Sequence, residues 1–366
     1  MLCRYLLLSS RISFSAFLSI KLVWLGVLSF LSYETLYTTS PGTFRQRFYE
    51  LFLGLHVILQ ASALGFLFFH HPASRPYVGI ALGVFVIDRL IFRLFLTSRS
   101  FRADLSILED DETVLLSSDW DIGRASWWSL YNIQRGWKPT EHVFLTVPAL
   151  SRKHVIQAHP FTIASAAPDV STAETTHAWL SLIIRARDGF SRDLLLHAKS
   201  HRSVNVRIDG PYGSTHALNI LRNSENAVIV AGGSGIAVAY PLLFDIIASA
   251  SGSDDAEAGA YTKRQVTLIW IVHDAQHIEW IGRSRLDDLC RRGLNLVIPP
   301  PTRNAGRPNI EKLLRDVLVQ RRGASGSSIG VVVTGPDTMN RSARNTCARL
   351  AMQGFDVKVS VEKFGW

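Results

Sequence analysis

Seven consecutive residues, His-Pro-Phe-Thr-Ile-Ala-Ser from His159 to Ser165, bring together an imidazole, an aromatic ring and two hydroxyls. An aromatic ring can stack on a flat heteroaromatic group and hydroxyls can bond to its polar edge, so this combination suits a flavin. Further along, the apolar run Ala227 to Ala231 leads into the glycine turn Gly232 to Gly235 and a helix-like stretch, Ile236 to Ser249. In that context, helix N-terminal amides can hold a pyrophosphate. The two segments therefore predict binding of a flavin and of a nicotinamide dinucleotide.

Four further motifs follow the order found in a known family. They are Gly210-Pro-Tyr-Gly213, Gly306-Arg-Pro308, Thr334-Gly-Pro336 and the terminal Glu362-Lys-Phe-Gly-Trp366. Together with the first two segments they resemble the fungal ferric-chelate reductases, relatives of the NADPH oxidases, over roughly Trp24 to Trp366. The resemblance implies transmembrane helices followed by an antiparallel β-barrel that binds FAD and a ferredoxin reductase-like, doubly wound α/β domain that binds NAD(P).

The resemblance also assigns roles to the flavin segment. Phe161 is expected to stack on the isoalloxazine ring, Thr162 to hydrogen-bond near the flavin N5, and His159 to approach the pyrophosphate. Gly189-Phe-Ser191 resembles the family's second box, in which backbone amides and a hydroxyl hold phosphate oxygens. The remaining FAD-binding residues that it implies are Pro160, Ser165, Gly189, Ser191, Gly210 and Gly213. The alternative is that His159 to Ser165 is an ordinary barrel strand with an outward imidazole.

Residues 101–213 predict the barrel. Short strand-like runs, such as Val143 to Val147, Trp179 to Arg185 and Val204 to Ile208, are separated by Gly, Pro and charge clusters, as in small antiparallel barrels. The loop Lys138-Pro-Thr-Glu-His142 is similar to the family's Pro-Gly-Gln-His loop, but Thr140 stands where the family has glycine. A side chain there restricts the turn, which counts against tight FAD binding.

Residues 214–366 predict the nucleotide domain, because apolar runs alternate with helix-like stretches as in a parallel sheet covered on both faces. The later runs are Gln265 to Val272, Leu294 to Ile298, Ile329 to Val333 and Val357 to Val361.

Two residues at the predicted dinucleotide site depart from the family. His273 stands where the family has an arginine suited to the ribose 2′-phosphate, and neutral histidine is a poorer phosphate partner. Arg307 with Lys263 or Arg264 can compensate, so NADPH is favoured and NADH is the alternative. Thr334 replaces a cysteine near the hydride path, which predicts slower hydride transfer. The implied dinucleotide-binding residues are Gly232, Gly233, Gly235, His273, Arg307, Gly335 and Pro336, and the implied catalytic ones are Thr162, Thr334 and Trp366. Trp366 is expected to lie over the flavin as a gate, the alternative being a hydrophobic terminus packed on the core.

Residues 1–100 predict a membrane region with about three transmembrane helices. Leu51 to Phe69 has no charge and is long enough to span a bilayer core, while Phe14 to Leu31 and Tyr77 to Leu96 carry charges near their ends. Arginines before the second span and at the end of the third place those ends, and the FAD and NAD(P) domains, in the cytosol. The chain is thus expected in the plasma membrane or an endomembrane, in contact with the lipid bilayer.

His56 and His70 lie in the second span on nearly one helix face, about 21 Å apart along the axis. Histidine is a common axial ligand of haem iron, and the family uses a similar helix for two haems, so both are candidate ligands of haem b. The alternative is an interfacial histidine at each end. No histidine precedes His56, which predicts incomplete haem sites or a partner subunit that supplies the missing ligands. His71 is expected to be a loop residue.

Composition excludes other classes. Of the net charge of +9, the first hundred residues contribute +6, nine Lys and Arg against three Asp and Glu, so the basicity is membrane-flanking and does not indicate nucleic acid. Three widely spaced cysteines indicate neither disulfides nor a cysteine metal site. We expect electrons to pass from NADPH through FAD, and through haem where it is bound, to a ferric chelate in iron uptake. The alternatives are superoxide production and an inactive, truncated nucleotide-binding subunit.

Overall fold

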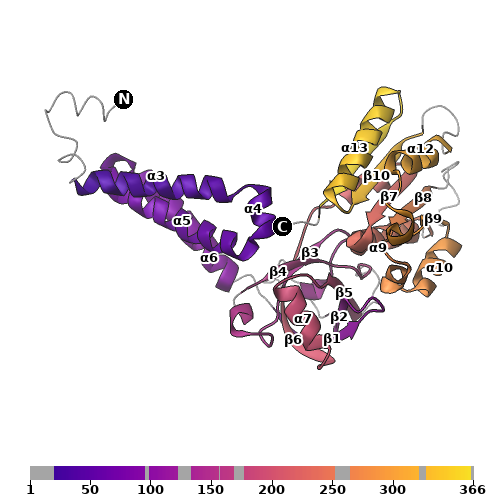
Figure 1. The fold of residues 1–366 in the computed structure, drawn as a ribbon, viewed down its shortest axis with the longest axis horizontal. Coiled ribbons are helices and arrows are strands. Elements are labelled where there is room, and N and C mark those ends of the chain that lie inside the picture. Colours follow the sequence, from indigo (N-terminus) through magenta and orange to yellow (C-terminus); the bar gives the residue numbers. More distant parts are fainter. Residues whose placement is uncertain are drawn as a thin grey trace. The chain divides into compact units, whose positions relative to one another are not determined.

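The computed structural model describes residues 20–94, 99–122, 133–155, 157–168, 177–251, 264–320 and 327–363 (Figure 1). The described residues form two compact units, residues 20–94 and residues 99–363. Trp366, to which a gating role is assigned above, lies outside the described residues, as does Lys263.

The first unit is helical. Its elements are α3 (Lys21–Thr39), α4 (Gly42–Arg47), α5 (Tyr49–His70), η1 (Pro72–Ser74) and α6 (Arg75–Leu94). Among the described residues, only Leu51–His70 of α5 is both long and apolar enough to cross a membrane. Helix α3 overlaps the first expected span, Phe14 to Leu31, but it continues to Thr39; residues 14–19 lie outside the described part.

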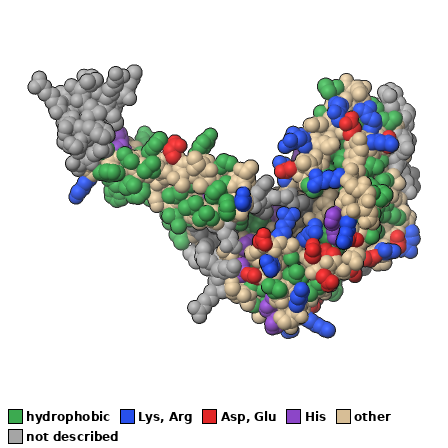
Figure 2. All heavy atoms as spheres, in the orientation of Figure 1, with side chains coloured by type: hydrophobic (Ala, Val, Ile, Leu, Met, Phe, Trp, Pro, Cys, Tyr) green, Lys and Arg blue, Asp and Glu red, His purple; other side chains and the backbone are tan. Residues whose placement is uncertain are grey.

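Small residues bring α3 and α5 together. The Ser29 hydroxyl donates to the Ala63 carbonyl oxygen at 3.1 Å, and Ala63 is fully buried. Close approach of helices through small and hydroxyl residues is typical of helix pairs in membranes, where apolar side chains gain nothing by leaving lipid. Large apolar side chains instead lie on the outside of α3, α5 and α6 (Figure 2), among them Trp24, Phe30, Ile58, Phe69 and Ile80.

The second unit begins with a six-stranded antiparallel sheet in the order β4-β3-β6-β1-β2-β5. Its strands are β1 (Arg99–Ile107), β2 (Thr113–Asp121), β3 (His142–Thr146), β4 (His159–Thr162), β5 (His177–Arg185) and β6 (Ser203–Tyr212), with η2 (Ile133–Arg135) and η3 (Arg152–Val155) between them. The sheet closes into a barrel just after β4, where the Ala164 amide donates to the Ser181 carbonyl oxygen at 2.8 Å. No strand-like run named from the sequence covers β1 or β2.

Alternating side chains fill the barrel. Inward residues include Leu105, Val114, Leu116, Val143, Leu145, Leu180, Leu182, Val206 and Ile208. Helix α7 (Phe190–Ala198) adds Phe190 and Leu194 to this cluster. Because strand side chains alternate between faces, the residues between these positions face outward and are available to cofactors or to the second domain.

The nucleotide domain is a five-stranded parallel sheet in the order β11-β10-β7-β8-β9. Its strands are β7 (Asn226–Gly232), β8 (Gln265–Ile271), β9 (Leu294–Val297), β10 (Ile329–Thr334) and β11 (Val357–Glu362), so each expected apolar run agrees with a strand to within one residue at each end. The connecting elements are α8 (His216–Arg222), η4 (Gly233–Gly235), α9 (Ile236–Ser251), η5 (Ala275–Trp280), α10 (Arg283–Arg291), α11 (Thr302–Ala305), α12 (Ile310–Gln320) and α13 (Asp337–Met352). Helices α8, α9 and α10 share one buried cluster with the sheet, and α12 and α13 share another, which gives the expected doubly wound arrangement.

Candidate cofactor sites

The two glycine segments of the nucleotide domain meet at the point where the strand order reverses. Strands β7 and β10 are neighbours, with Ala231 opposite Thr334, while the chain from β7 continues to β8 on the other side. Parallel α/β sheets bind ligands outside the carboxyl ends of their strands at such a switch point. The turn Gly232–Gly235 and the turn Thr334–Pro336 are therefore side by side at the edge where a dinucleotide is expected.

These turns are so close that only glycine fits. A Cβ on Gly335 would lie 3.1 Å from the Gly232 Cα, and a Cβ on Gly232 would lie 3.0 Å from the Pro336 Cδ. A Cβ on Gly235 would overlap the Thr334 carbonyl oxygen. Gly233 differs, because its φ is +54° and no atom lies within 4 Å of the position that a Cβ would take. The turn is thus packed on one side and open on the other, as a cradle for a pyrophosphate requires.

Trp270 fixes the shape of this cradle, a role that the sequence did not predict. Its indole nitrogen donates to the Gly233 carbonyl oxygen at 3.1 Å, and its side chain is completely buried in β8. A buried tryptophan needs a partner for its N–H. A tryptophan in a strand of otherwise mostly aliphatic residues could therefore have indicated a hydrogen bond to a nearby turn. The bond holds the carbonyl of Gly233 toward the sheet.

His273 lies at the same carboxyl edge, just after β8. Its Nδ1 is 3.0 Å from the Thr302 hydroxyl, and the Arg303 amide donates to the His273 carbonyl oxygen at 3.0 Å. The Arg303 guanidinium donates to Asp274 at 2.8 Å and holds the pKa of that carboxyl below its usual value. Arg303 is a cation beside His273 that belongs to none of the sequence motifs. Arg307, its neighbour in the chain, is exposed.

Arg264 cannot compensate for the missing arginine, so that alternative is wrong. Arg264 directly precedes β8, whereas His273 follows it, and seven strand residues separate the two by about 20 Å. Its side chain instead donates to the Ser224 carbonyl oxygen at 3.0 Å. Parallel strands place only their carboxyl ends at the cofactor edge. The apolar pattern of the sequence does not show that Arg264 lies at the other end of the strand.

The predicted flavin residues gather aromatic rings at the start of α7. On β4, His159 and Phe161 share one face and Pro160 and Thr162 the other, because strand side chains alternate. The His159 ring stacks on Phe190 with centroids 4.2 Å apart, and Phe161 lies 6.0 Å from the same ring. The roles of all four residues toward a flavin stay predictions.

The start of α7 itself suits a phosphate. Gly189 precedes the helix at φ 68°, and the amides of the first turn have no intrahelical partners. With the His159 ring against Phe190, these donors fit the pyrophosphate of FAD. The Ser191 hydroxyl accepts from the Arg187 amide at 2.9 Å, so it orders the turn that leads into the helix.

Ser165 has a structural role. Its hydroxyl accepts from the Ser181 amide at 3.0 Å, next to the Ala164 bond that closes the barrel. Its carbonyl oxygen accepts from the Trp137 indole at 3.3 Å. Both contacts belong to the barrel, and contact with the flavin edge stays a prediction.

Gly210 and Gly213 pack against the loop that departs from the family. A Cβ on Gly213 would lie 3.0 Å from the Glu141 Cα, and one on Gly210 would lie 3.2 Å from the His142 carbonyl oxygen. Glu141 is buried, which raises its pKa, and its carboxylate accepts from the Lys138 amide at 2.7 Å. Thr140 keeps a glycine-like φ of +76°, and its hydroxyl donates to the Ser214 carbonyl oxygen at 2.7 Å.

The helices offer few ligands for haem. Within residues 20–94, the histidines are His56, His70 and His71. His70 lies against α3, with its Nδ1 2.7 Å from the Leu22 carbonyl oxygen, and a Cβ on Gly26 would lie 2.6 Å from its ring. His56 lies beside Phe52, 5.3 Å between ring centroids, and His71 is exposed at the end of α5, as expected. These residues supply one imidazole at each level, fewer than two bis-histidine haems need.

An antiparallel barrel joined to a doubly wound domain with a glycine cradle at its switch point is the architecture of a flavoprotein reductase that uses a pyridine nucleotide. Residues 131–216 match the family model described as an FAD-binding domain. Residues 224–292 match the one described as the ferric reductase NAD binding domain. The second unit of the chain is therefore similar to the FAD-binding and NAD-binding domains of ferric reductases over these two segments.

Similar proteins come from fungi and a plant. "Ferric/cupric reductase transmembrane component 7" of Saccharomyces cerevisiae is 26% identical over 74% of this chain and 39% of its own length. "Ferric reductase transmembrane component 1" of Schizosaccharomyces pombe is 25% identical over 73% of this chain and 49% of its own. "Ferric reduction oxidase 2" of Arabidopsis thaliana is 28% identical over 61% and 28%. The chain spans less than half the length of these relatives.

Among solved structures, a ferredoxin NADP+ reductase from Neisseria gonorrhoeae with bound FAD and NADP is similar with a TM-score of 0.47. The match is 14% identical and covers 73% of this chain and 99% of that one.

Proposed function

We propose that this chain is a membrane-bound flavin oxidoreductase that takes electrons from NADPH, passes them through FAD and delivers them to a ferric chelate in iron uptake. The observation that carries the proposal is the meeting of the two glycine turns at the switch point, in a unit that also contains the FAD-type barrel. The names of the similar proteins, all reductases of ferric or cupric iron in the fungal cases above, support the acceptor class.

The residues of the chain contribute binding and orientation. Bound FAD would accept a hydride and release single electrons. The α7 amides and His159 would hold its pyrophosphate, and the open side of Gly233 would receive that of the dinucleotide. Thr334 and Gly335, packed against Gly232, would border the nicotinamide. Holding both rings in place is the main contribution that we assign to the protein.

Contact with a membrane is supported by the apolar length of α5 and by the exposed apolar side chains of α3 and α6. We propose that all three helices span the plasma membrane or an endomembrane and that the FAD and NAD(P) domains face the cytosol. The arginines Arg45 and Arg47 next to α5 support this orientation. A partner subunit with further histidines would complete haem sites at His56 and His70, and no step above depends on them.

The test uses the full chain purified in detergent. We expect one FAD per chain, bleached by NADPH without oxygen and reoxidised by a ferric chelate. The double substitution Phe161→Ala with Thr162→Ala should lower FAD content or slow bleaching, whereas Thr146→Ala on the neighbouring strand should not. A chain without FAD, or with FAD that NADPH cannot reduce, would contradict the proposal and favour the inactive subunit. Superoxide formed in place of ferrous iron would identify oxygen as the acceptor.

A further inference from the structure

A buried carboxylate joins the barrel to the nucleotide domain. Asp110 lies in the turn between β1 and β2, within the acidic run Glu109 to Glu112, yet its side chain is only 6% exposed. Residues of the same turn supply part of the hydrogen bonding of the Asp110 carboxylate, because the Thr113 amide donates to it at 2.9 Å and the Thr113 hydroxyl at 2.6 Å. The Glu112 amide donates at 3.2 Å. Asp110 is therefore held in one orientation by the barrel itself.

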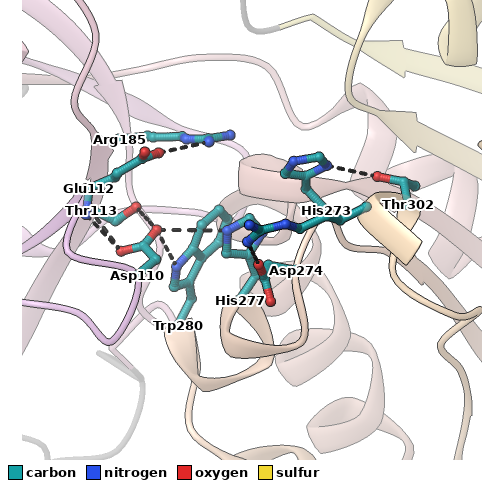
Figure 3. Close-up of polar contacts among 10 residues, drawn as sticks. Asp110, Glu112, Thr113, Arg185, His273, Asp274, His277, Trp280 and Thr302 are labelled. Carbon is teal, nitrogen blue, oxygen red and sulfur yellow. Dashed lines mark hydrogen bonds and ion pairs between the residues drawn. The ribbon is translucent and has the colours of Figure 1, made fainter. Parts of the chain in front are cut away.

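The remaining contacts of this carboxylate come from η5 of the nucleotide domain. The Trp280 indole donates to Asp110 Oδ2 at 3.3 Å, and His277 Nε2 lies 3.8 Å from the same oxygen (Figure 3). The His277 and Trp280 rings stack with centroids 4.3 Å apart, and both are buried. A single oxygen of the barrel thus meets two rings of the other domain.

Apolar packing surrounds this polar contact. Leu108 and Leu115 of the barrel, with Ile183 of β5, belong to the same buried cluster as Trp280 and Ile278. Apolar packing alone would hold the two domains together without specifying their register. A buried carboxylate adds little net stability, since an apolar replacement is often as stable, but it penalises every arrangement in which its partners are lost. The contact of Asp110 with Trp280 and His277 is therefore suited to fixing the position of the nucleotide domain on the barrel.

The position that it fixes is that of the cofactor edge. Segment η5 begins at Ala275, directly after His273 and Asp274. The same short stretch therefore carries residues expected beside the dinucleotide and the rings that contact the barrel. A shift of η5 on the barrel would move the dinucleotide relative to a flavin held by β4 and α7.

We propose that Asp110 is a positioning residue: through Trp280 and His277 it holds η5 on the barrel and so sets the approach of nicotinamide to flavin. The consequence for hydride transfer rests on the proposed function, while the contact itself does not. Asp110 is not among the residues assigned above to either cofactor. Its loss is therefore expected to slow the transfer without weakening the binding of either cofactor.

The experiment compares the full chain with Asp110→Asn, Trp280→Phe and, as matched control, Glu112→Gln. Glu112 lies in the same turn, but its side chain is 62% exposed and pairs with Arg185. Hydrogen–deuterium exchange is measured over residues 108–113 and 275–281. Both test variants should exchange roughly tenfold faster in both segments, as expected for loss of a hydrogen bond to a charged group. Glu112→Gln should exchange like the unsubstituted chain.

The kinetic measurement separates positioning from binding. In both test variants the rate of FAD reduction at saturating NADPH should fall roughly tenfold, with FAD content and the affinity for adenosine 2′,5′-bisphosphate unchanged. Unchanged exchange in both variants would overturn the proposal, and so would unchanged reduction rates in an active enzyme. Loss of FAD from folded Trp280→Phe protein would also overturn it, because binding would then be affected. If NADPH does not reduce the unsubstituted chain, the proposed function fails, and the exchange measurement alone decides whether the contact exists.

Discussion

Replacing Gly235 by alanine tests the packed side of the glycine cradle. The new Cβ would overlap the Thr334 carbonyl oxygen and lie 3.0 Å from the Thr334 carbonyl carbon. Both neighbours are backbone atoms, so they cannot rotate away as a side chain would. Overpacking of this kind costs about 1–3 kcal/mol, and we expect the upper part of that range. For a domain of this size, about 3 kcal/mol lowers Tm by roughly 6–12 °C.

Gly233→Ala tests the open side and should behave differently. Its Cβ meets nothing, but the φ of +54° costs an L-residue roughly 1–2 kcal/mol, so Tm should fall by only a few degrees. The methyl group would stand in the space assigned to the pyrophosphate. Saturating NADPH, which at a hundredfold excess over Kd adds about 2.7 kcal/mol to the unsubstituted chain, should therefore stabilise this variant much less.

The assay is thermal unfolding of the full chain in detergent, with and without NADPH. Gly354→Ala is the matched control, since Gly354 has φ +87° and open space but lies before β11 at the opposite edge of the sheet. It should lose stability as Gly233→Ala does and keep the full response to NADPH. If Gly235→Ala unfolds at the temperature of the unsubstituted chain, the close contact between the turns is refuted. If Gly233→Ala keeps the NADPH response, the pyrophosphate lies elsewhere.

Three further outcomes are expected. His273→Arg should raise the ratio of kcat/KM for NADPH to kcat/KM for NADH, because a charge-assisted contact with the 2′-phosphate would stabilise the NADPH transition state by about 1–3 kcal/mol. An unchanged ratio would assign the 2′-phosphate to other residues such as Arg303. Burial lowers the pKa of His277 below its usual 6.5, against the opposing effect of Asp110, so the unfolded chain binds more protons and stability should fall as pH drops below about 6.5. His277→Phe should remove that part of the pH dependence in unfolding curves, and an identical pH profile would contradict it. Thr334→Val removes a buried hydroxyl without a hydrogen-bond partner and should raise the free energy of unfolding by about 1 kcal/mol, which denaturant titration would show; a loss of stability would mean that the hydroxyl is satisfied.

The apolar runs of the sequence were sufficient to place the strands of the nucleotide domain, because the three inner strands, β7, β8 and β10, are buried on both faces and read as uninterrupted stretches, such as Ile329 to Thr334. The half-exposed strands of the barrel were harder. Strand β2, Thr113–Asp121, includes two aspartates and two serines, and its outward polar side chains hide the alternation of the inward ones. The contact of Asp110 with Trp280 was beyond reach, since the acidic run around Asp110 is typical of an exposed turn and its burial depends on a segment far away in the chain.

Some of the candidate cofactor residues could likewise be found from the sequence, and others could not. The glycines of Gly232–Gly235 and Thr334–Pro336 were found through motifs, because backbone approach restricts the residue type so strictly. Arg303 was missed, since its place beside His273 follows from the path of the chain after β9, which no local pattern records. Roles toward FAD and NADPH stay predictions for every site residue.

Thr140 shows how a substitution can become entrenched during evolution. Its φ of +76° is unfavourable for a β-branched residue, yet its hydroxyl holds the Ser214 carbonyl oxygen. Reversion to glycine would relieve the backbone, but it would also remove that bond and loosen the unfolded chain; one gain and two losses of about 1 kcal/mol each would lower the free energy of unfolding by about 1 kcal/mol. Selection on stability would then act against reversion, and lineages that acquired threonine here would tend to retain it whatever side chain position 214 carries, because the bond is to the backbone.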